Sequence, residues 1–347
     1  MNMVKKMMGV GLAMCFGLAV WAGAARGEDA VPLNVQSSVD RGLEFLAAQQ
    51  DKKTGAWKAP NDGATTAVTS LAVMAFLSRG HVPGQGPYGD LVNKGVDYVL
   101  TQQQPNSGVI TLNMGQSMYG HGMATVMLCE VYGMVDDERR VKIDAALAKA
   151  VKLILDAQRV PKDDNNKGGW RYTPESSDSD ISLTGWQLMA LRGAANAGAA
   201  VPKKALDDGI AYIRRRAVVG GGFSYNGNDG PNQGRTGCGI LSLELLGQHL
   251  SKEAVAGGDY LMRNRVTGGG DFYYYAVYYC SQAANQLGGK YWDGIYRPLR
   301  DALVQSQRQN GSWAGVGNEG QGGDNYATAM AVLGLCVPYR YLPLYQR

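Results

Sequence analysis

The chain has 347 residues, and its 34 basic and 30 acidic residues give a formal net charge of +4 at pH 7. Three basic residues, Lys5, Lys6 and Arg26, lie within residues 1–27, which contain no acidic residue, so the remainder carries a net charge of only +1. A chain this close to neutral lacks the basic surface that nucleic-acid binding requires, and we expect no nucleic-acid partner.

Residues 1–27 have the pattern of a secretory signal peptide. Two lysines precede an apolar run over residues 7–21, and small residues lead to a predicted cleavage site after Ala24 or Gly27. The apolar run is shorter than the ~20 residues that a spanning helix needs, and no later segment is long and apolar enough. We therefore expect an exported protein, periplasmic or extracellular, without a transmembrane anchor.

Amphipathic helical patterns recur along the rest of the chain. In the first of them, Val39, Leu43, Leu46 and Ala47 follow one another at short helical steps, so a helix there buries a single stripe. Six segments have this pattern: residues 39–50, 92–103, 145–158, 206–216, 254–264 and 295–307.

Each amphipathic segment is followed by a helical segment that is apolar on nearly every side. These are residues 63–77, 120–133, 178–193, 231–247, 268–284 and 322–336. Because a helix that is apolar all round is buried on both sides, six of them should form an inner ring within six amphipathic helices. The sequence thus predicts an all-α fold, an (α/α)6 toroid, with residues 28–347 forming one domain.

Two polar columns align the starts of the apolar segments. The first holds Thr65, His121, Asp180, Asn232, Asp271 and Asp324. The second lies four residues later and holds Thr69, Thr125, Thr184, Thr236, Tyr275 and Thr328. We expect one register to fit all six segments, with both columns near the starts of the apolar helices.

The turns between the two helices of a pair carry a second signature. Gln49–Trp57, Ala157–Trp170 and Gln305–Trp313 each contain Gln, then a glycine turn, then Trp. The Gln-x-x-x-Gly-x-Trp form of Gln307–Trp313 resembles the repeat of the prenyltransferase and squalene oxidase superfamily, which includes squalene–hopene cyclases and protein prenyltransferase β-subunits. The resemblance covers residues 36–340. It implies an α/α barrel with an apolar central cavity and an active site at the mouth where the inner helices begin.

Neither catalytic signature of that superfamily is complete in this chain. Protonating cyclases carry Asp-x-Asp-Asp-Thr, whereas residues 178–182 read Asp-Ser-Asp-Ile-Ser and lack the last carboxylate. Asp178 and Asp180 remain candidate acids, although Asp180 before an apolar run is also typical of a helix cap. Of the Asp, Cys and His that hold zinc in prenyltransferases, only Asp271 is matched.

Three further chemistries use the same topology or the same residues. The thioester domain of complement-like proteins joins Cys to Gln, and no such Gln follows Gly-Cys-Gly at residues 237–239. A polysaccharide-cleaving enzyme needs carboxylates and aromatic platforms, for which Asp271 and the tyrosines after it are candidates. His121, Asp180 and Asp271 would suit a metal site, but without a local ligand motif we favour a hydrogen-bonded structural histidine and predict no metal or cofactor.

Four cysteines remain after the signal peptide. Cys129, Cys238, Cys280 and Cys336 lie in apolar helical patterns without CxxC or Cys–His spacing, which favours buried thiols. Export would permit disulfides, and the three possible pairings stay open.

The leading hypothesis is an exported toroid that has lost both catalytic signatures and binds a ligand or a protein partner. An isoprenoid, a lipid or a glycan is the expected class of ligand, and the sequence does not indicate an oligomeric state. A divergent enzyme stays open, either cyclase-like or a carbohydrate-active hydrolase or lyase, as does an envelope scaffold whose cavity is filled by tyrosines. The candidate catalytic residues are Asp180, Asp178 and Asp271, and the candidate ligand-binding residues are His121, Asn232, Tyr275, Asp324, Tyr273 and Trp186.

Overall fold

The computed structural model describes residues 31–60 and 63–346, and within these ranges it is almost entirely helical. The predicted signal peptide lies outside the described residues. A two-stranded antiparallel hairpin, β1 (Lys58–Ala59) and β2 (Gly63–Ala64), precedes the second helix. Among the described residues, no helix is both long and apolar enough to cross a membrane.

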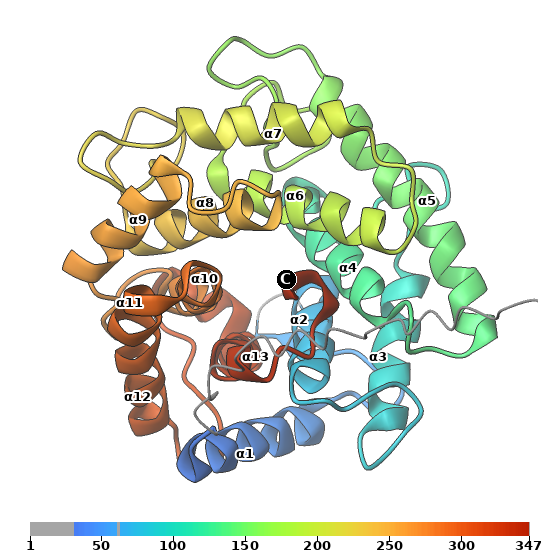
Figure 1. Ribbon diagram of the computed structural model, residues 1–347. Helices are drawn as coiled ribbons and strands as arrows, with labels where there is room; N and C mark the ends of the chain where they lie inside the picture. The colour runs from blue at the N-terminus through green and yellow to red at the C-terminus, as the bar shows by residue number, and fades with distance from the viewer. Residues whose placement is uncertain (1–30, 61–62, 347) are drawn as a thin grey trace, which may run out of the picture.

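The helices form two concentric rings (Figure 1). The inner ring consists of α2 (Thr66–Ser78), α4 (Ser117–Val131), α6 (Ile181–Asn196), α8 (Gln233–Leu245), α10 (Tyr273–Leu287) and α13 (Gly323–Leu335). The outer ring consists of α1 (Leu33–Gln49), α3 (Gly89–Thr101), α5 (Asp137–Arg159), α7 (Lys203–Arg215), α9 (Lys252–Arg263) and α12 (Arg297–Ser306). Consecutive inner helices pack together and α13 packs against α2, which confirms the predicted (α/α)6 toroid.

Several short helical turns lie between or after the helices of the two rings. The single turn α11 (Gly289–Tyr291) and the π-helical turn η2 (Trp292–Tyr296) lead into α12. The other turns are the 3₁₀ segments η1 (Met114–Gln116), η3 (Gly317–Gly322), η4 (Val337–Tyr339) and η5 (Pro343–Tyr345).

Burial differs between the two rings as the apolar patterns predict. In α2 every residue from Val68 to Ser78 is buried, because outer helices cover one side and the other inner helices the opposite side. In the amphipathic helix α3 the buried positions include Val92, Val96 and Val99, which form one stripe.

Four glutamines join the turns to the neighbouring outer helices. The side-chain amides of Gln50, Gln103, Gln158 and Gln307 each donate two hydrogen bonds of 2.8–3.0 Å. One bond goes to a glycine carbonyl in the glutamine's own turn, and the other to a carbonyl at the next outer helix. For Gln307 the second acceptor is Ser38 in α1, so the last helix pair is joined to the first.

Side chains of the second polar column accept hydrogen bonds from the residues that end these turns. The backbone N–H groups of Trp57, Trp170, Phe223 and Trp313 donate to Thr69, Thr184, Thr236 and Thr328 at 3.0–3.1 Å. In α4 the acceptor is Nδ1 of His121, which binds the N–H of Ile110 at 3.1 Å.

The prediction of one register for all six segments is therefore wrong at α4. This helix begins at Ser117, one turn earlier than the alignment on Thr125 placed it. His121 consequently belongs to the second column, and Thr125 merely donates to the His121 carbonyl.

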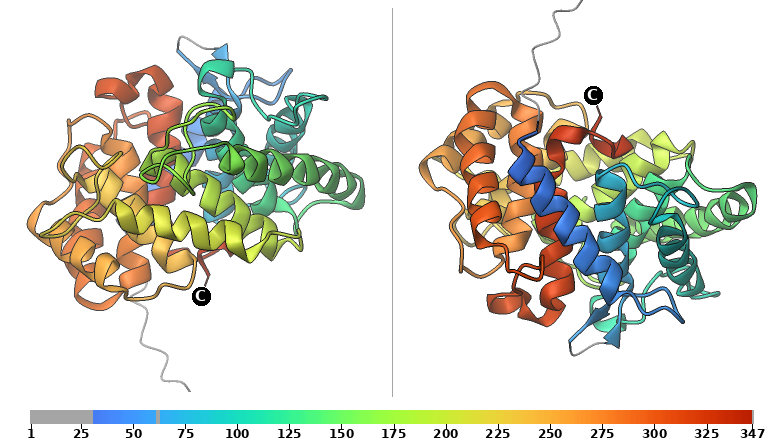
Figure 2. Two further views of the ribbon diagram at one scale, coloured as in Figure 1. Left: turned by 90° about the horizontal axis from the view of Figure 1, so that it is seen from above. Right: turned by 90° about the horizontal axis from the view of Figure 1, so that it is seen from below.

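Aromatic side chains occupy the middle of the ring. The rings of Trp186 and Tyr278 stack at 5.7 Å, and Tyr279 lies edge-on to both. From the end where the inner helices finish, Tyr345 of η5 reaches the Tyr278 hydroxyl, and Gln286 donates to the Tyr345 carbonyl at 3.0 Å. This C-terminal segment and the β1–β2 hairpin lie at opposite ends of the ring (Figures 1 and 2). These buried aromatic side chains therefore line the region where the sequence predicts an apolar cavity.

Candidate ligand-binding mouth

A pocket of about 510 Å³ opens at the end where the inner helices begin. We call it the mouth pocket; β1, the start of α2, the segment before α4 and the η3–α13 segment contribute to its lining. Its polar lining includes Thr66, Thr111, Gln116, Tyr119, Gln321 and Tyr326, and its apolar lining includes Leu112 and Val68. Within the described part of the chain, no charged residue lines it.

Asp180 caps α6 beside this mouth and is completely buried. Its Oδ1 accepts the N–H of Leu183 at 2.9 Å, and its Oδ2 accepts Arg171 and the Tyr225 hydroxyl, each at 3.0 Å. Burial raises the pKa of Asp180 to about 6, although these three donors favour the carboxylate. Since both oxygens are engaged within the protein, Asp180 acts as a cap and presents no free oxygen to a substrate.

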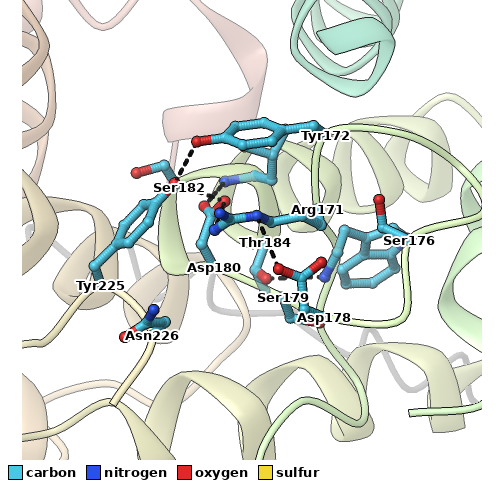
Figure 3. A network of polar contacts seen from close by, with 12 residues as sticks. Arg171, Tyr172, Ser176, Asp178, Ser179, Asp180, Ser182, Thr184, Tyr225 and Asn226 are labelled. Carbon is cyan, nitrogen blue, oxygen red and sulfur yellow. Dashed lines mark hydrogen bonds and ion pairs between the residues drawn. The ribbon is translucent and has the colours of Figure 1, made fainter. Parts of the chain in front are cut away.

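Arg171 holds this acidic cluster together (Figure 3). Its guanidinium also pairs with the half-exposed Asp178 at 3.2 Å, and it lies 4.3 Å from the ring centre of Tyr172. The Tyr172 and Tyr225 hydroxyls bond to each other at 2.8 Å. The groups of this cluster therefore bond mainly to one another, and its one cation, Arg171, pairs with two aspartates.

Glu319 is a buried mouth residue that the sequence reasoning missed. Its carboxylate accepts the N–H groups of Tyr274 and Tyr275 at 2.8 Å and the Tyr326 hydroxyl at 2.9 Å, so it caps α10 from the segment before α13. Burial raises its pKa, while the N–H donors lower it. An available signal was the lone acid within the glycine-rich residues 315–323.

Three other polar candidates, Asn232, Asp324 and Asp271, make contacts that do not involve Asp180. Asn232 caps α8 by accepting the Arg235 N–H at 2.9 Å. Asp324 accepts Arg308 and the Gly315 N–H, and the exposed Asp271 accepts the Asn318 N–H. The cap of α10 is Glu319 from the next helix pair, and Asp271 does not cap this helix.

The predicted aromatic residues are mostly internal. Tyr273 is 6% exposed and Trp186 is 0% exposed. Tyr275 donates its hydroxyl to Ser182 Oγ at 2.9 Å, which places it near the start of α6. None of the three lines the mouth pocket, whereas Tyr119 and Tyr326, which the sequence analysis did not select, both line it.

His121 is fully buried between helix pairs and does not reach the mouth. Its Nε2 lies 3.3 Å from the Ala150 carbonyl in α5, and burial lowers its pKa to about 4. It is thus a neutral, hydrogen-bonded structural histidine, and the prediction of a ligand-binding His121 is wrong. Among residues 31–60 and 63–346, no three or more His, Cys, Asp or Glu side chains are grouped so that they could hold a metal ion, so His121, Asp180 and Asp271 are not brought together.

Among the described residues, four cysteines have free thiols; Cys238, Cys280 and Cys336 are buried and Cys129 is partly buried. Burial raises the pKa of Cys238 and of Cys336 to about 12. Such thiols carry almost no thiolate at neutral pH and are poor nucleophiles.

Several solved structures share this toroid at low sequence identity. An α-1,6-mannanase from Salegentibacter sp. aligns with a TM-score of 0.65 and 11% identity, over 88% of this chain and 99% of that chain. A variant of a type II terpene cyclase from Scytonema, in complex with geranylgeranyl dihydroxybenzoate, aligns with a TM-score of 0.58 and 13% identity, over 90% and 98%. Candida albicans protein geranylgeranyltransferase-I has a TM-score of 0.52 and 14% identity, over 86% and 90%. These identities support the fold alone; no protein-family model and no curated protein matches the sequence.

Proposed function

We propose that the protein is an exported saccharide-binding toroid that holds a neutral oligosaccharide in the mouth pocket. The observation that carries this proposal is the lining, which combines hydroxyls, amides and two tyrosines with no charged side chain among the described residues. Hydroxyls and amides both donate and accept hydrogen bonds, as a sugar does, and a tyrosine adds a flat apolar face. A volume of about 510 Å³ lies within the ordinary range of small-molecule sites.

The aromatic middle of the ring argues against an isoprenoid as the ligand. A long apolar chain would need an apolar tunnel along the ring, and Trp186, Tyr278 and Tyr345 occupy that region. The mouth pocket is lined by several hydroxyl and amide side chains, which suits a sugar better than a hydrocarbon.

Binding without cleavage is favoured by the state of the buried carboxylates. Glycoside hydrolysis uses two carboxyl groups that flank the scissile bond. Both oxygens of Asp180 and both oxygens of Glu319 already accept hydrogen bonds from the protein. Neither group is available to protonate a leaving group or to activate water without breaking a helix cap.

Two further observations support the proposal. The signal-peptide pattern of residues 1–27 would bring the protein to a compartment where polysaccharides occur. An inactive variant of the Salegentibacter mannanase, which shares the toroid with a TM-score of 0.61, is in complex with α-1,6-mannotriose. The fold therefore accommodates a neutral oligosaccharide in another protein.

The test is calorimetric titration of the purified protein with four neutral trisaccharides: α-1,6-mannotriose, cellotriose, xylotriose and maltotriose. Trigalacturonate serves as an acidic comparison and geranylgeraniol as an isoprenoid. We expect at least one neutral trisaccharide to bind and the two comparison compounds not to bind. Tyr119→Ala should weaken that binding, whereas Tyr341→Ala, at an exposed tyrosine outside the mouth pocket, should not. Binding of geranylgeraniol alone, or cleavage of a bound trisaccharide, would refute the proposal.

A further inference from the structure

The mouth pocket contains a buried hydroxyl without a hydrogen-bond partner. Thr66, the first residue of α2, is 2% exposed, and its Oγ1 has no partner among the described residues. Its neighbours differ: Thr65 Oγ1 accepts the Val68 N–H, and Thr69 Oγ1 accepts the Trp57 N–H. A buried hydroxyl left unpaired is unfavourable, so the one at Thr66 calls for an explanation.

A second hydroxyl lies beside the first. Thr111 also lines the pocket, and its Oγ1 accepts the Asn113 N–H at 3.2 Å. Both hydroxyls approach the same side of Gly120. A Cβ atom built on Gly120 would lie 2.7 Å from Thr111 Oγ1 and 2.9 Å from Thr66 Oγ1. These separations are too short for a carbon atom, so a side chain at residue 120 would displace both hydroxyls.

Gly120 therefore lets the two hydroxyls lie close to the same backbone atom, at the wall of the mouth pocket. Any larger residue at this position would place a methyl group against both oxygens and displace them. Because no cation lines the pocket in the described residues, the two hydroxyls offer no charge to a carboxylate or a phosphate. A neutral hydroxyl in the pocket, which can both donate and accept, matches them.

We propose that Thr66, Thr111 and Gly120 form a subsite that receives one hydroxyl group of the bound saccharide. The inference rests on the proposed function and adds to it a specificity determinant. The subsite selects sugars with a free hydroxyl at that position over analogues in which the hydroxyl is absent or replaced by a charged group. A site built to pair a hydroxyl rejects the analogue without it, because its own polar groups are then left unpaired.

The test uses whichever of the four neutral trisaccharides binds the unsubstituted protein most tightly. Thr66→Val and Gly120→Ala should each weaken its binding at least about tenfold, as expected for the loss of a buried hydrogen bond. Gly115→Ala is the matched glycine control, since a Cβ there would meet only Asn113 Oδ1 at 3.8 Å; its affinity should not change.

Thermal unfolding provides a second readout that does not depend on the sugar. Thr66→Val should keep or raise the melting temperature, because it removes a hydroxyl that has no protein partner. Thr69→Val, one turn later on the same helix, should lower it by leaving the Trp57 N–H unpaired. A lower melting temperature for Thr66→Val would show that the hydroxyl has a structural partner and would overturn the subsite.

The outcomes separate the two proposals. If the unsubstituted protein binds none of the four trisaccharides, the proposed function fails, and the subsite with it. If it binds one of them and both Thr66→Val and Gly120→Ala bind that sugar equally well, the subsite alone is refuted.

Discussion

The amide of Gln307 offers a direct test of how the ring is closed. It donates 2.8 Å hydrogen bonds to Ser38 in α1 and to Gly311 in its own turn, and its Oε1 accepts Arg41. Gln307→Leu keeps the approximate size of the side chain but removes all three contacts. Each buried amide bond contributes about 1 kcal/mol net, and the exposed contact to Arg41 adds less, so we expect a loss of roughly 2–3 kcal/mol in the free energy of unfolding.

The assay is urea unfolding followed by circular dichroism, with hydrogen exchange to locate the change. The exchange of α1 should accelerate, because Gln307 holds α1 against the last turn. Gln305→Leu is the control, since Gln305 is exposed on α12 and its loss should change stability by less than about 0.5 kcal/mol. Equal urea midpoints for the two variants would refute the role of Gln307 in ring closure.

Two further predictions concern buried carboxyl groups. Burial raises the pKa of Glu130 to about 8 from an ordinary value of 4.5. Between these two pH values the folded protein retains a proton that the unfolded chain releases. The free energy of unfolding should therefore fall as the pH rises from about 4.5 to 8. Glu130→Gln should flatten that part of the profile of melting temperature against pH; an unchanged slope would show that another group causes it. Asp180→Asn should lower the free energy of unfolding by about 1–3 kcal/mol in urea titrations, because Arg171 loses its buried partner and the amide keeps only some of the cap's hydrogen bonds. Asp178→Asn, at the exposed partner of the same arginine, should cost less, and a reversed order would contradict the network.

The apolar periodicity was enough to predict the helices and their arrangement in two rings. Burial on both sides leaves a nearly continuous apolar pattern, as in residues 68–78, whereas one buried stripe leaves the spacing of Val92, Val96 and Val99. The alternation of amphipathic and apolar segments then predicted which helices form a pair. The error at His121 arose because a threonine at residue 125 imitated the column, while the helix began one turn earlier.

The site was less predictable because its contacts join distant parts of the chain. Glu319 caps α10 from the following helix pair, and Tyr345 reaches Tyr278 across the ring. Neither contact can be recognised from the spacing of neighbouring residues in the sequence. Thr66 looked like an ordinary residue of an apolar helix, and only its position beside Gly120 and Thr111 distinguishes it. Asp180 was the exception, because a helix cap is a local feature, and that interpretation was confirmed.

The bond from Gln307 to Ser38 also limits how such a chain can change its length over evolution. In an open solenoid each repeat contacts only its neighbours, so whole repeats can be gained or lost at the ends. Here α13 packs against α2, and the turn after α12 is bonded to α1, so the ring formed by the described helices has no open edge at which to add a unit. Deleting one helix pair would leave a gap between surfaces that must meet, and inserting one would force them apart. The number of repeats is thus set by geometry, and variation is confined to the turns and segments at the two ends of the ring.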